Sequence, residues 1–223
     1  MHGTFAEIFD IAAARKGGAT AFEATLPVPK PAAELEEIPA DRWLAGMTRA
    51  VFQAGFSWKV IEAKWPGFEA VFHGFDTGRC ALMSDDDFDA AVKDARIVRN
   101  AAKIRSVAEN AAFLNALTRE HGSAGKAFAR WPAEDYTGLL ALLKKRGSRL
   151  GGTSGQYFLR AMGVDGFVLS RDVVRALIRE GVVEKEPSSQ RDMARVQAAF
   201  DRWRAESGRP MSAISRTLAN SVE

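Results

Sequence analysis

One short segment combines an amide, a glycine and two aromatic rings. Gln53, Gly55, Phe56 and Trp58 all lie within residues 53–58. An enzyme that turns a base out of a DNA duplex needs such parts, because an apolar side chain must fill the gap and an aromatic face must receive the base. Packing of Phe56 and Trp58 in a core explains the same pattern, and the pattern by itself favours that explanation.

A second group of residues suits contact with a phosphate backbone. Its cations, glycines and hydroxyl residues lead into a predicted helix over 153–162, and they are Lys144, Lys145, Arg146, Gly147, Arg149, Gly151, Gly152, Thr153 and Ser154. Glycine lets a backbone approach a phosphate closely, and the first N–H groups of a helix attract anions. The segment could hold DNA without reading its bases. A glycine-rich turn with solvated charges accounts for the pattern equally well.

Asp172 is the candidate catalytic carboxylate. It lies in the first turn of a predicted helix over 171–180, after Gly163 has ended the preceding helix. From there it could stabilise an oxocarbenium-like sugar or activate a water molecule. The alternative role is electrostatic, because an anion in the first turn interacts favourably with the helix dipole.

Apolar residues at helical spacing predict an all-α fold with short connecting loops. Strand signals are scarce, since no sustained alternation of apolar and polar residues occurs. One helix is expected from Asp41 to a break at Gly55, and another from Ser57 to about Lys64. The other expected helices cover residues 4–16, 67–73, 85–94, 97–120, 135–145, 153–162, 171–180, 188–206 and 210–220.

Several residues are expected to mark helix ends. Asp41 and Ser57 are candidate N-caps, and Ser84 with Asp87 is typical of a capping box. Residues 65–67 (Trp-Pro-Gly) are expected to form a turn. Prolines punctuate residues 24–40, which predicts mostly extended or turn structure there.

The charge is spread unevenly along the chain. Its 223 residues are 47% hydrophobic and carry a formal net charge of +3. Residues 1–40 hold three Lys or Arg against six Asp or Glu, whereas residues 141–180 hold eight against three. A local basic excess indicates a surface that faces an anionic partner such as DNA.

Several functional classes are not indicated. Cys80 is the single cysteine, so no intramolecular disulfide can form, and we expect it to be a buried apolar side chain. His2, His73 and His121 lack the spacing of metal ligands, so no metal is predicted. Neither phosphate-binding nucleotide motif occurs, and no cofactor is expected. Without an apolar run of membrane length or a signal-peptide pattern, the expected location is the cytoplasm.

Four blocks of the sequence, in order, resemble the 3-methyladenine DNA glycosylase I family. Residues 53–58 (QAGFSW) resemble its QAGLSW, and Phe68, Phe72, Phe75 and Asp76 resemble the segment that follows. Residues 94–100 with Lys103 and Ile104 are similar to DAGIIRN…KI. Residues 144–154, closed by Gly163, are similar to KKRG…VGPTT…G. The resemblance covers roughly residues 41–176.

This resemblance implies a helix-hairpin-helix DNA glycosylase fold. Such an enzyme binds duplex DNA containing an alkylated base, flips that base out and hydrolyses its N-glycosidic bond in base excision repair, without lyase activity. It implies that Gln53 and Trp58 line the base pocket, that Gly55 and Phe56 form the wedge, and that residues 147–154 hold the backbone. Residues 1–40 would then pack as a helix and proline-rich segment on a glycosylase domain over 41–223.

The sequence departs from the family at its pocket and at its zinc site. The pocket glutamate of the family falls on Ala50, and two zinc-ligand positions fall on Asp172 and Ala176. By the same alignment Ser170 takes the place of the superfamily's catalytic aspartate, two residues before Asp172. No zinc is therefore predicted.

Two alternatives follow from these departures. One is a non-catalytic module of the same fold that binds damaged DNA, and the other is a glycosylase for a different lesion. A carboxylate such as Glu62 or Asp172 beside Trp58 would favour an enzyme. A cleft filled by apolar side chains would favour the module.

Overall fold

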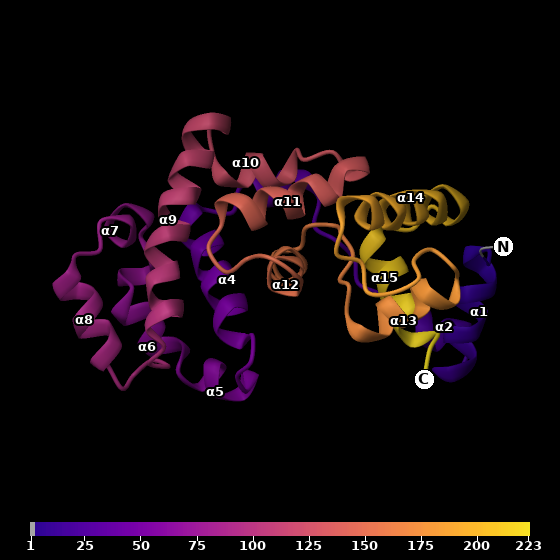
Figure 1. Cartoon of the computed structure of the whole chain (residues 1–223), viewed down its shortest axis with the longest axis horizontal. Helices are drawn as coiled ribbons and strands as arrows, with labels where there is room; N and C mark the ends of the chain where they lie inside the picture. The colour runs from indigo at the N-terminus through magenta and orange to yellow at the C-terminus, as the bar shows by residue number, and fades with distance from the viewer. Residues whose placement is uncertain (1–2) are drawn as a thin grey trace. The chain divides into compact units, whose positions relative to one another are not determined.

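The computed structural model describes residues 3–223, so His2 lies outside the described part of the chain. Within that part every regular element is a helix, which confirms the all-α class (Figure 1). Contacts divide the chain into two units. We call residues 31–131 with 140–162 the central unit, and residues 3–30, 132–139 and 163–223 the terminal unit.

The central unit is organised around α9, Ala101–His121. This helix packs against α4, α7, α8 and α10, and Figure 1 shows it between α4 and α7. α4 also packs against α12. The remaining bounds are α3 Ala32–Glu36, α4 Ala40–Gln53, α5 Trp58–Ala63, α6 Trp65–Val71, η1 His73–Phe75, α7 Thr77–Ala81, α8 Asp85–Lys93, α10 Ala124–Ala129 and α12 Thr153–Met162.

Aromatic side chains fill the core of the central unit. Trp43 of α4 is fully buried, and its ring lies 4.6 Å from that of Phe128 on α10. Phe52, at the end of α4, meets Phe68 of α6 edge to face at 4.7 Å. These contacts bury large apolar areas and fix α4, the helix that precedes residues 53–58.

The terminal unit gathers segments that lie far apart in the sequence. α15, Met211–Asn220, packs against α1, Phe5–Arg15, and against α13 and α14. Asp165 accepts hydrogen bonds from the backbone N–H groups of Met211 and Ser212, and so caps α15. The other elements are α2 Ala19–Glu23, η2 Ala133–Asp135, α13 Arg171–Arg179 and α14 Gln190–Ser207; α11, Tyr136–Arg146, runs from this unit into the central one.

Several expected helix boundaries are confirmed. The capping box of Ser84 and Asp87 begins α8, and α12 has the expected limits. Gly122 ends α9 in the left-handed conformation that favours glycine. No described helix has the length and apolarity that crossing a bilayer requires. The expected boundary between residues 40 and 41 stays a prediction.

Other boundaries differ from expectation. Asp41 is not an N-cap, because Pro39 holds that position and the Asp41 carboxylate pairs with Arg42. The expected turn at residues 65–67 is the first turn of α6, where proline is well tolerated because its missing N–H has no helical partner. α9 begins at residue 101, not 97, because the Asn100 side chain caps it.

Candidate nucleic-acid interface

Residues 53–58, which we call the wedge loop, join α4 to α5. Gly55 has a φ of 76°, and apart from its chain neighbours no residue has an atom within 4 Å of the place where a β-carbon would stand. Phe56 is 40% exposed and Trp58 is 56% exposed. Packing in a core therefore does not explain these two rings, and both are available to a partner.

Trp58 meets a second exposed aromatic side chain. The ring of Tyr157, on α12, lies edge-on to it with centroids 6.2 Å apart and is 40% exposed. Aromatic pairs favour this geometry, which holds the indole in one orientation. Tyr157 was not among the predicted site residues, because nothing in the sequence places a residue of α12 beside the wedge loop.

A carboxylate does lie beside the wedge loop. The Gln53 amide donates a hydrogen bond to Glu62 Oε1 at 3.2 Å, and Arg49 Nε lies 3.5 Å from the same oxygen. Glu62 follows Trp58 by one turn of α5, so both side chains project from one face of that helix. Ala50, where the resemblance expects a glutamate, is a buried methyl group.

The hairpin, residues 147–152, connects α11 to α12. Arg149 and Gly152 have positive φ values of 59° and 62°, which turn the chain sharply between the two helices. A β-carbon on Gly147 would lie 2.7 Å from the Leu143 carbonyl oxygen, so this position requires glycine. The predicted helix, hairpin and helix are thus present, and the start of α12 is exposed beside the hairpin.

The predicted backbone-binding cations differ in their surroundings. Lys144, Lys145 and Arg149 are exposed. Arg146 instead donates to both carboxylate oxygens of Glu120, at 2.7 and 2.6 Å. This hydrogen bonding raises the pKa of Arg146 and lowers that of Glu120. A phosphate would have to replace Glu120 before Arg146 could bind it.

Asp172 lies in the first turn of α13, in the terminal unit. Its carboxylate is 53% exposed and lies 3.7 Å from Arg175. Ser170 caps α13 by accepting a hydrogen bond from the Val173 N–H. These local contacts suit the electrostatic alternative, and a catalytic role for Asp172 stays a prediction.

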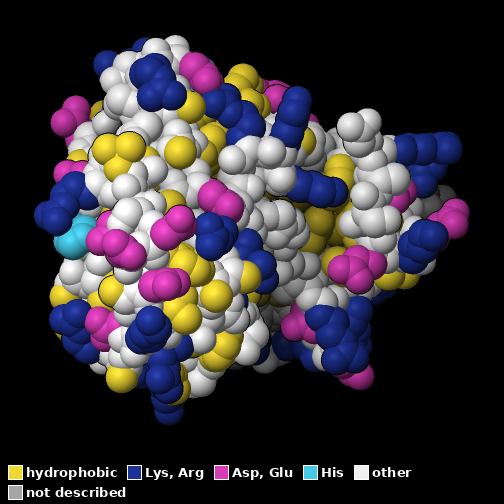
Figure 2. Space-filling view, turned by 60° about the vertical axis from the view of Figure 1, so that its left-hand side comes forward, with side chains coloured by type: hydrophobic (Ala, Val, Ile, Leu, Met, Phe, Trp, Pro, Cys, Tyr) yellow, Lys and Arg dark blue, Asp and Glu magenta, His cyan; other side chains and the backbone are white. Residues whose placement is uncertain are grey.

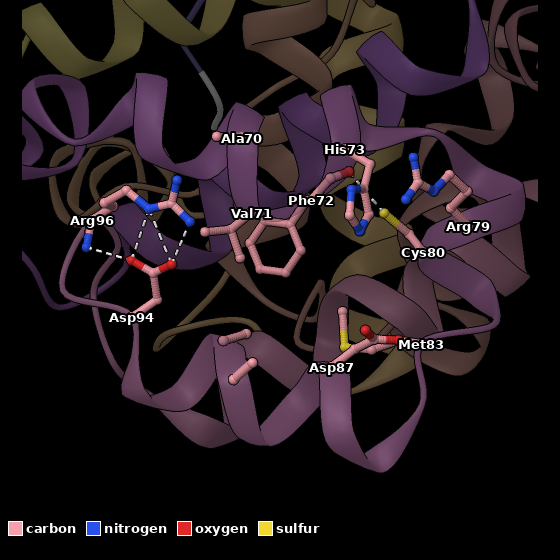
Figure 3. A pocket seen from close by; sticks show the side chains of 12 residues that line it. Ala70, Val71, Phe72, His73, Arg79, Cys80, Met83, Asp87, Asp94 and Arg96 are labelled. Carbon is pink, nitrogen blue, oxygen red and sulfur yellow. Dashed lines mark hydrogen bonds and ion pairs between the residues drawn. The ribbon is translucent and has the colours of Figure 1, made fainter.

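The central unit also contains a cavity of about 210 Å³, and none of the predicted site residues lines it (Figure 3). At one side of the cavity Arg96 pairs with Asp94 at 2.6 Å, and this hydrogen bonding lowers the pKa of the Asp94 carboxyl to about 2. At the other, the buried Cys80 thiol donates to the Phe72 carbonyl oxygen, and burial raises its pKa to about 12. A thiol that stays protonated at neutral pH is a poor nucleophile.

Charges of both signs cover the face of the molecule in Figure 2. Lys and Arg side chains lie interspersed with Asp and Glu, so this face is not a uniform basic field. Within residues 3–223 no three His, Cys, Asp or Glu side chains form a group that could hold a metal.

Comparisons with known proteins agree with this architecture. The family model for methyladenine glycosylase matches residues 42–138. The DNA-3-methyladenine glycosylase 1 of Escherichia coli K12 is 39% identical over 59 residues, and the enzyme of Haemophilus influenzae is 34% identical over the same length. Each match covers 26% of this chain and 32% of the relative, so the chain spans about a third of these curated proteins.

Solved structures support the fold over a longer stretch. A crystal structure of 3-methyladenine DNA glycosylase I has a TM-score of 0.50 at 24% identity, covering 66% of this chain and 87% of that one. The Staphylococcus aureus enzyme has a TM-score of 0.51 at 17% identity, covering 66% and 85%. The described chain therefore shares the all-α fold of these proteins.

Proposed function

We propose that the protein is a DNA glycosylase for alkylated purines of the 3-methyladenine type, because the family model for methyladenine glycosylase matches residues 42–138. In this reaction a water oxygen bonds to C1′ of the sugar, and the bond from C1′ to the base breaks. The electron pair leaves with the base, and the water loses a proton. The products are a free base and an abasic site.

The exposed rings of Phe56 and Trp58 carry this proposal. Phe56 enters the gap that the flipped base leaves, and Trp58 stacks on that base. A methylated adenine is cationic, and a cation is attracted to the face of an indole ring. This attraction favours the substrate even though Ala50 offers no carboxylate.

The leaving group supplies much of the chemical driving force, because a cationic base departs as a neutral molecule. The protein then needs to hold the flipped pose and position a water molecule. Asp172 is the proposed group for that water. Glu62, one turn after Trp58, adds negative charge close to the cationic base.

The hairpin is the proposed grip on the DNA backbone. The free N–H groups at the start of α12, at Thr153 and Ser154, lie at the positive end of the helix dipole. Both the N–H groups and the dipole attract a phosphate anion. Lys144, Lys145 and Arg149 add positive charge, and Gly151 and Gly152 allow close approach. Arg146 joins them only after exchanging Glu120 for phosphate.

A single-turnover assay on methylated duplex DNA, with identification of the freed bases, tests this function. We expect 3-methyladenine to be released. Comparing Asp172→Asn with Glu62→Gln then separates the two carboxylates: loss of release in the first variant supports water activation by Asp172. Loss in Glu62→Gln for a cationic base, but not for a neutral one, supports an electrostatic role of Glu62.

Ala50 favours a second candidate function, a module that binds damaged DNA without cleaving it. A buried methyl group stands where the family has a pocket carboxylate. In that case the same assay gives no free base, while the protein still binds the methylated duplex more tightly than an unmodified one.

A further inference from the structure

Lys103 of α9 is buried, although lysine is rarely buried unless it is paired. Its ammonium nitrogen lies 2.8 Å from the Val51 carbonyl oxygen, 3.4 Å from that of Phe52 and 2.5 Å from that of Ala54. These are carbonyls at the end of α4, where a helix has no N–H groups left to bind them. Lys103 therefore caps α4 at the point where the wedge loop begins.

The same ammonium also contacts the ring of Phe56. It lies 4.6 Å from the Phe56 centroid, within the range of a cation–π interaction. Lys103 thus holds both the start of the wedge loop and the side chain proposed to enter the DNA. Its three donors and its charge are all used within the central unit.

Asn110 lies two turns further along α9 and is also buried. Its Oδ1 accepts a hydrogen bond from the Ser148 N–H at 2.8 Å, and its Nδ2 donates to the Ser148 carbonyl oxygen at 3.1 Å. The amide thereby satisfies both backbone groups of one hairpin residue. Arg149, the exposed cation of the hairpin, follows directly.

The two side chains project from one side of the same rigid helix. Seven residues make about two helical turns, or about 10 Å along the axis. We propose that Lys103 and Asn110 are positioning residues that hold the wedge loop and the hairpin at a fixed separation, so that both meet one DNA duplex together. The part of this inference that concerns DNA rests on the proposed function.

Hydrogen exchange tests the positioning without using activity. In Lys103→Met we expect faster amide exchange in residues 54–58 and unchanged exchange in 147–150. In Asn110→Leu we expect the reverse. Ser106→Ala is the matched control, because Ser106 is buried on α9 between the two and donates only within its helix, to the Lys103 carbonyl oxygen. Unchanged exchange in both loops of both variants would overturn the proposal.

DNA measurements test the consequence. Misplacing a catalytic part by about 1 Å costs up to about 100-fold in rate. We therefore expect Lys103→Met to lower base release at saturating DNA at least tenfold while duplex affinity is kept, and Lys103→Arg to restore part of that rate. Asn110→Leu should weaken duplex affinity and leave the saturated rate unchanged.

The outcomes distinguish this inference from the function on which it rests. If the wild-type protein releases no base, the glycosylase proposal fails, while exchange and duplex affinity still decide the positioning roles. If the wild-type protein is active and both variants lose affinity and rate in equal proportion, together with stability, α9 has a structural role and the positioning proposal is wrong.

Discussion

In the proposed function, Trp58 is the residue on which base recognition depends most directly. Stacking of a base on an aromatic side chain is worth about 1–3 kcal/mol. For Trp58→Ala we therefore expect base release at limiting DNA to fall by about 5- to 150-fold. Because the ring is 56% exposed, thermal unfolding should change little. Single-turnover rates over a range of DNA concentrations measure base release, and a melting curve measures thermal unfolding.

Val60→Ala is the matched control for Trp58→Ala. Val60 lies on the same helix and is 45% exposed, but it offers no aromatic face. Its substitution should leave base release close to the wild-type rate. Equal rates for the Trp58→Ala variant and the wild-type protein would contradict the stacking role.

We expect Lys103 to make the wedge loop sensitive to alkaline pH. Burial lowers the pKa of Lys103 from its ordinary value near 10.5, and repulsion by Arg149 of the hairpin lowers it further. The wedge loop presents neutral carbonyls and rings to this ammonium. As pH rises through the lowered pKa, the neutral amine loses a donor and its attraction to Phe56, so we expect base release to fall.

Stability should change in the opposite direction over the same range. Between the lowered pKa and 10.5 the unfolded chain binds the proton more tightly, so this group's contribution to the free energy of unfolding rises with pH. A rate profile and urea unfolding at each pH measure the two trends. In Lys103→Arg, whose guanidinium does not titrate here, the alkaline fall in rate should be absent. If the rate of Lys103→Arg still fell at alkaline pH, the titrating group would be one other than Lys103.

The sequence pointed to residues 53–58 as a candidate site but not to the residues that hold this loop. Gln53, Phe56 and Trp58 stand within one short motif, so their proximity follows from the chain itself. Lys103 and Asn110 contact residues 38 to 52 positions away, and such contacts depend on how helices pack. On sequence grounds Lys103 is a cation on a helix, and only its burial indicates what it caps.

At the level of elements, the hairpin should determine how strongly DNA binding depends on salt. Removing a cation that binds one phosphate reduces the slope of log affinity against log salt by about one. We expect Lys144→Ala, Lys145→Ala and Arg149→Ala each to weaken duplex binding and flatten that slope. Fluorescence titrations at several salt concentrations give both quantities.

Arg146→Ala is the internal comparison for these three variants. The Arg146 guanidinium already donates two hydrogen bonds to Glu120. Arg146→Ala should therefore change the salt slope less than the removal of an exposed cation. Glu120→Gln, which weakens that pair, should strengthen duplex binding. A steeper loss for Arg146→Ala than for Lys144→Ala would mean that phosphate displaces Glu120 readily.

Helices could be located from the sequence more accurately than their ends. The apolar spacing of α12 and the glycine after α9 are local signals, and both gave the observed limits. The predicted start of α4 was wrong, because the Asp41 carboxylate pairs with Arg42 and does not cap the helix. The start of α6 was wrong because a proline suits both a turn and a first helical turn.

At the level of the whole molecule, the fold class could be predicted and the division into units could not. An all-α class follows from periodicity, which is a local property. The terminal unit instead joins residues 3–30 to residues 163–223. Hydrogen bonds across this separation, such as that from the Phe5 N–H to Glu206, have no counterpart in sequence spacing.

The packing of α1 should therefore contribute measurably to stability. Ile8 is 1% exposed on this helix, which packs against α14 and α15. Truncating a buried isoleucine costs about 2–5 kcal/mol, through reduced burial and the cavity left behind. For Ile8→Ala we expect a lower urea midpoint with an unchanged slope, whereas Ile11→Ala, on the same helix but 43% exposed, should shift it far less. Equal shifts in the two variants would mean that α1 is not anchored through its buried face.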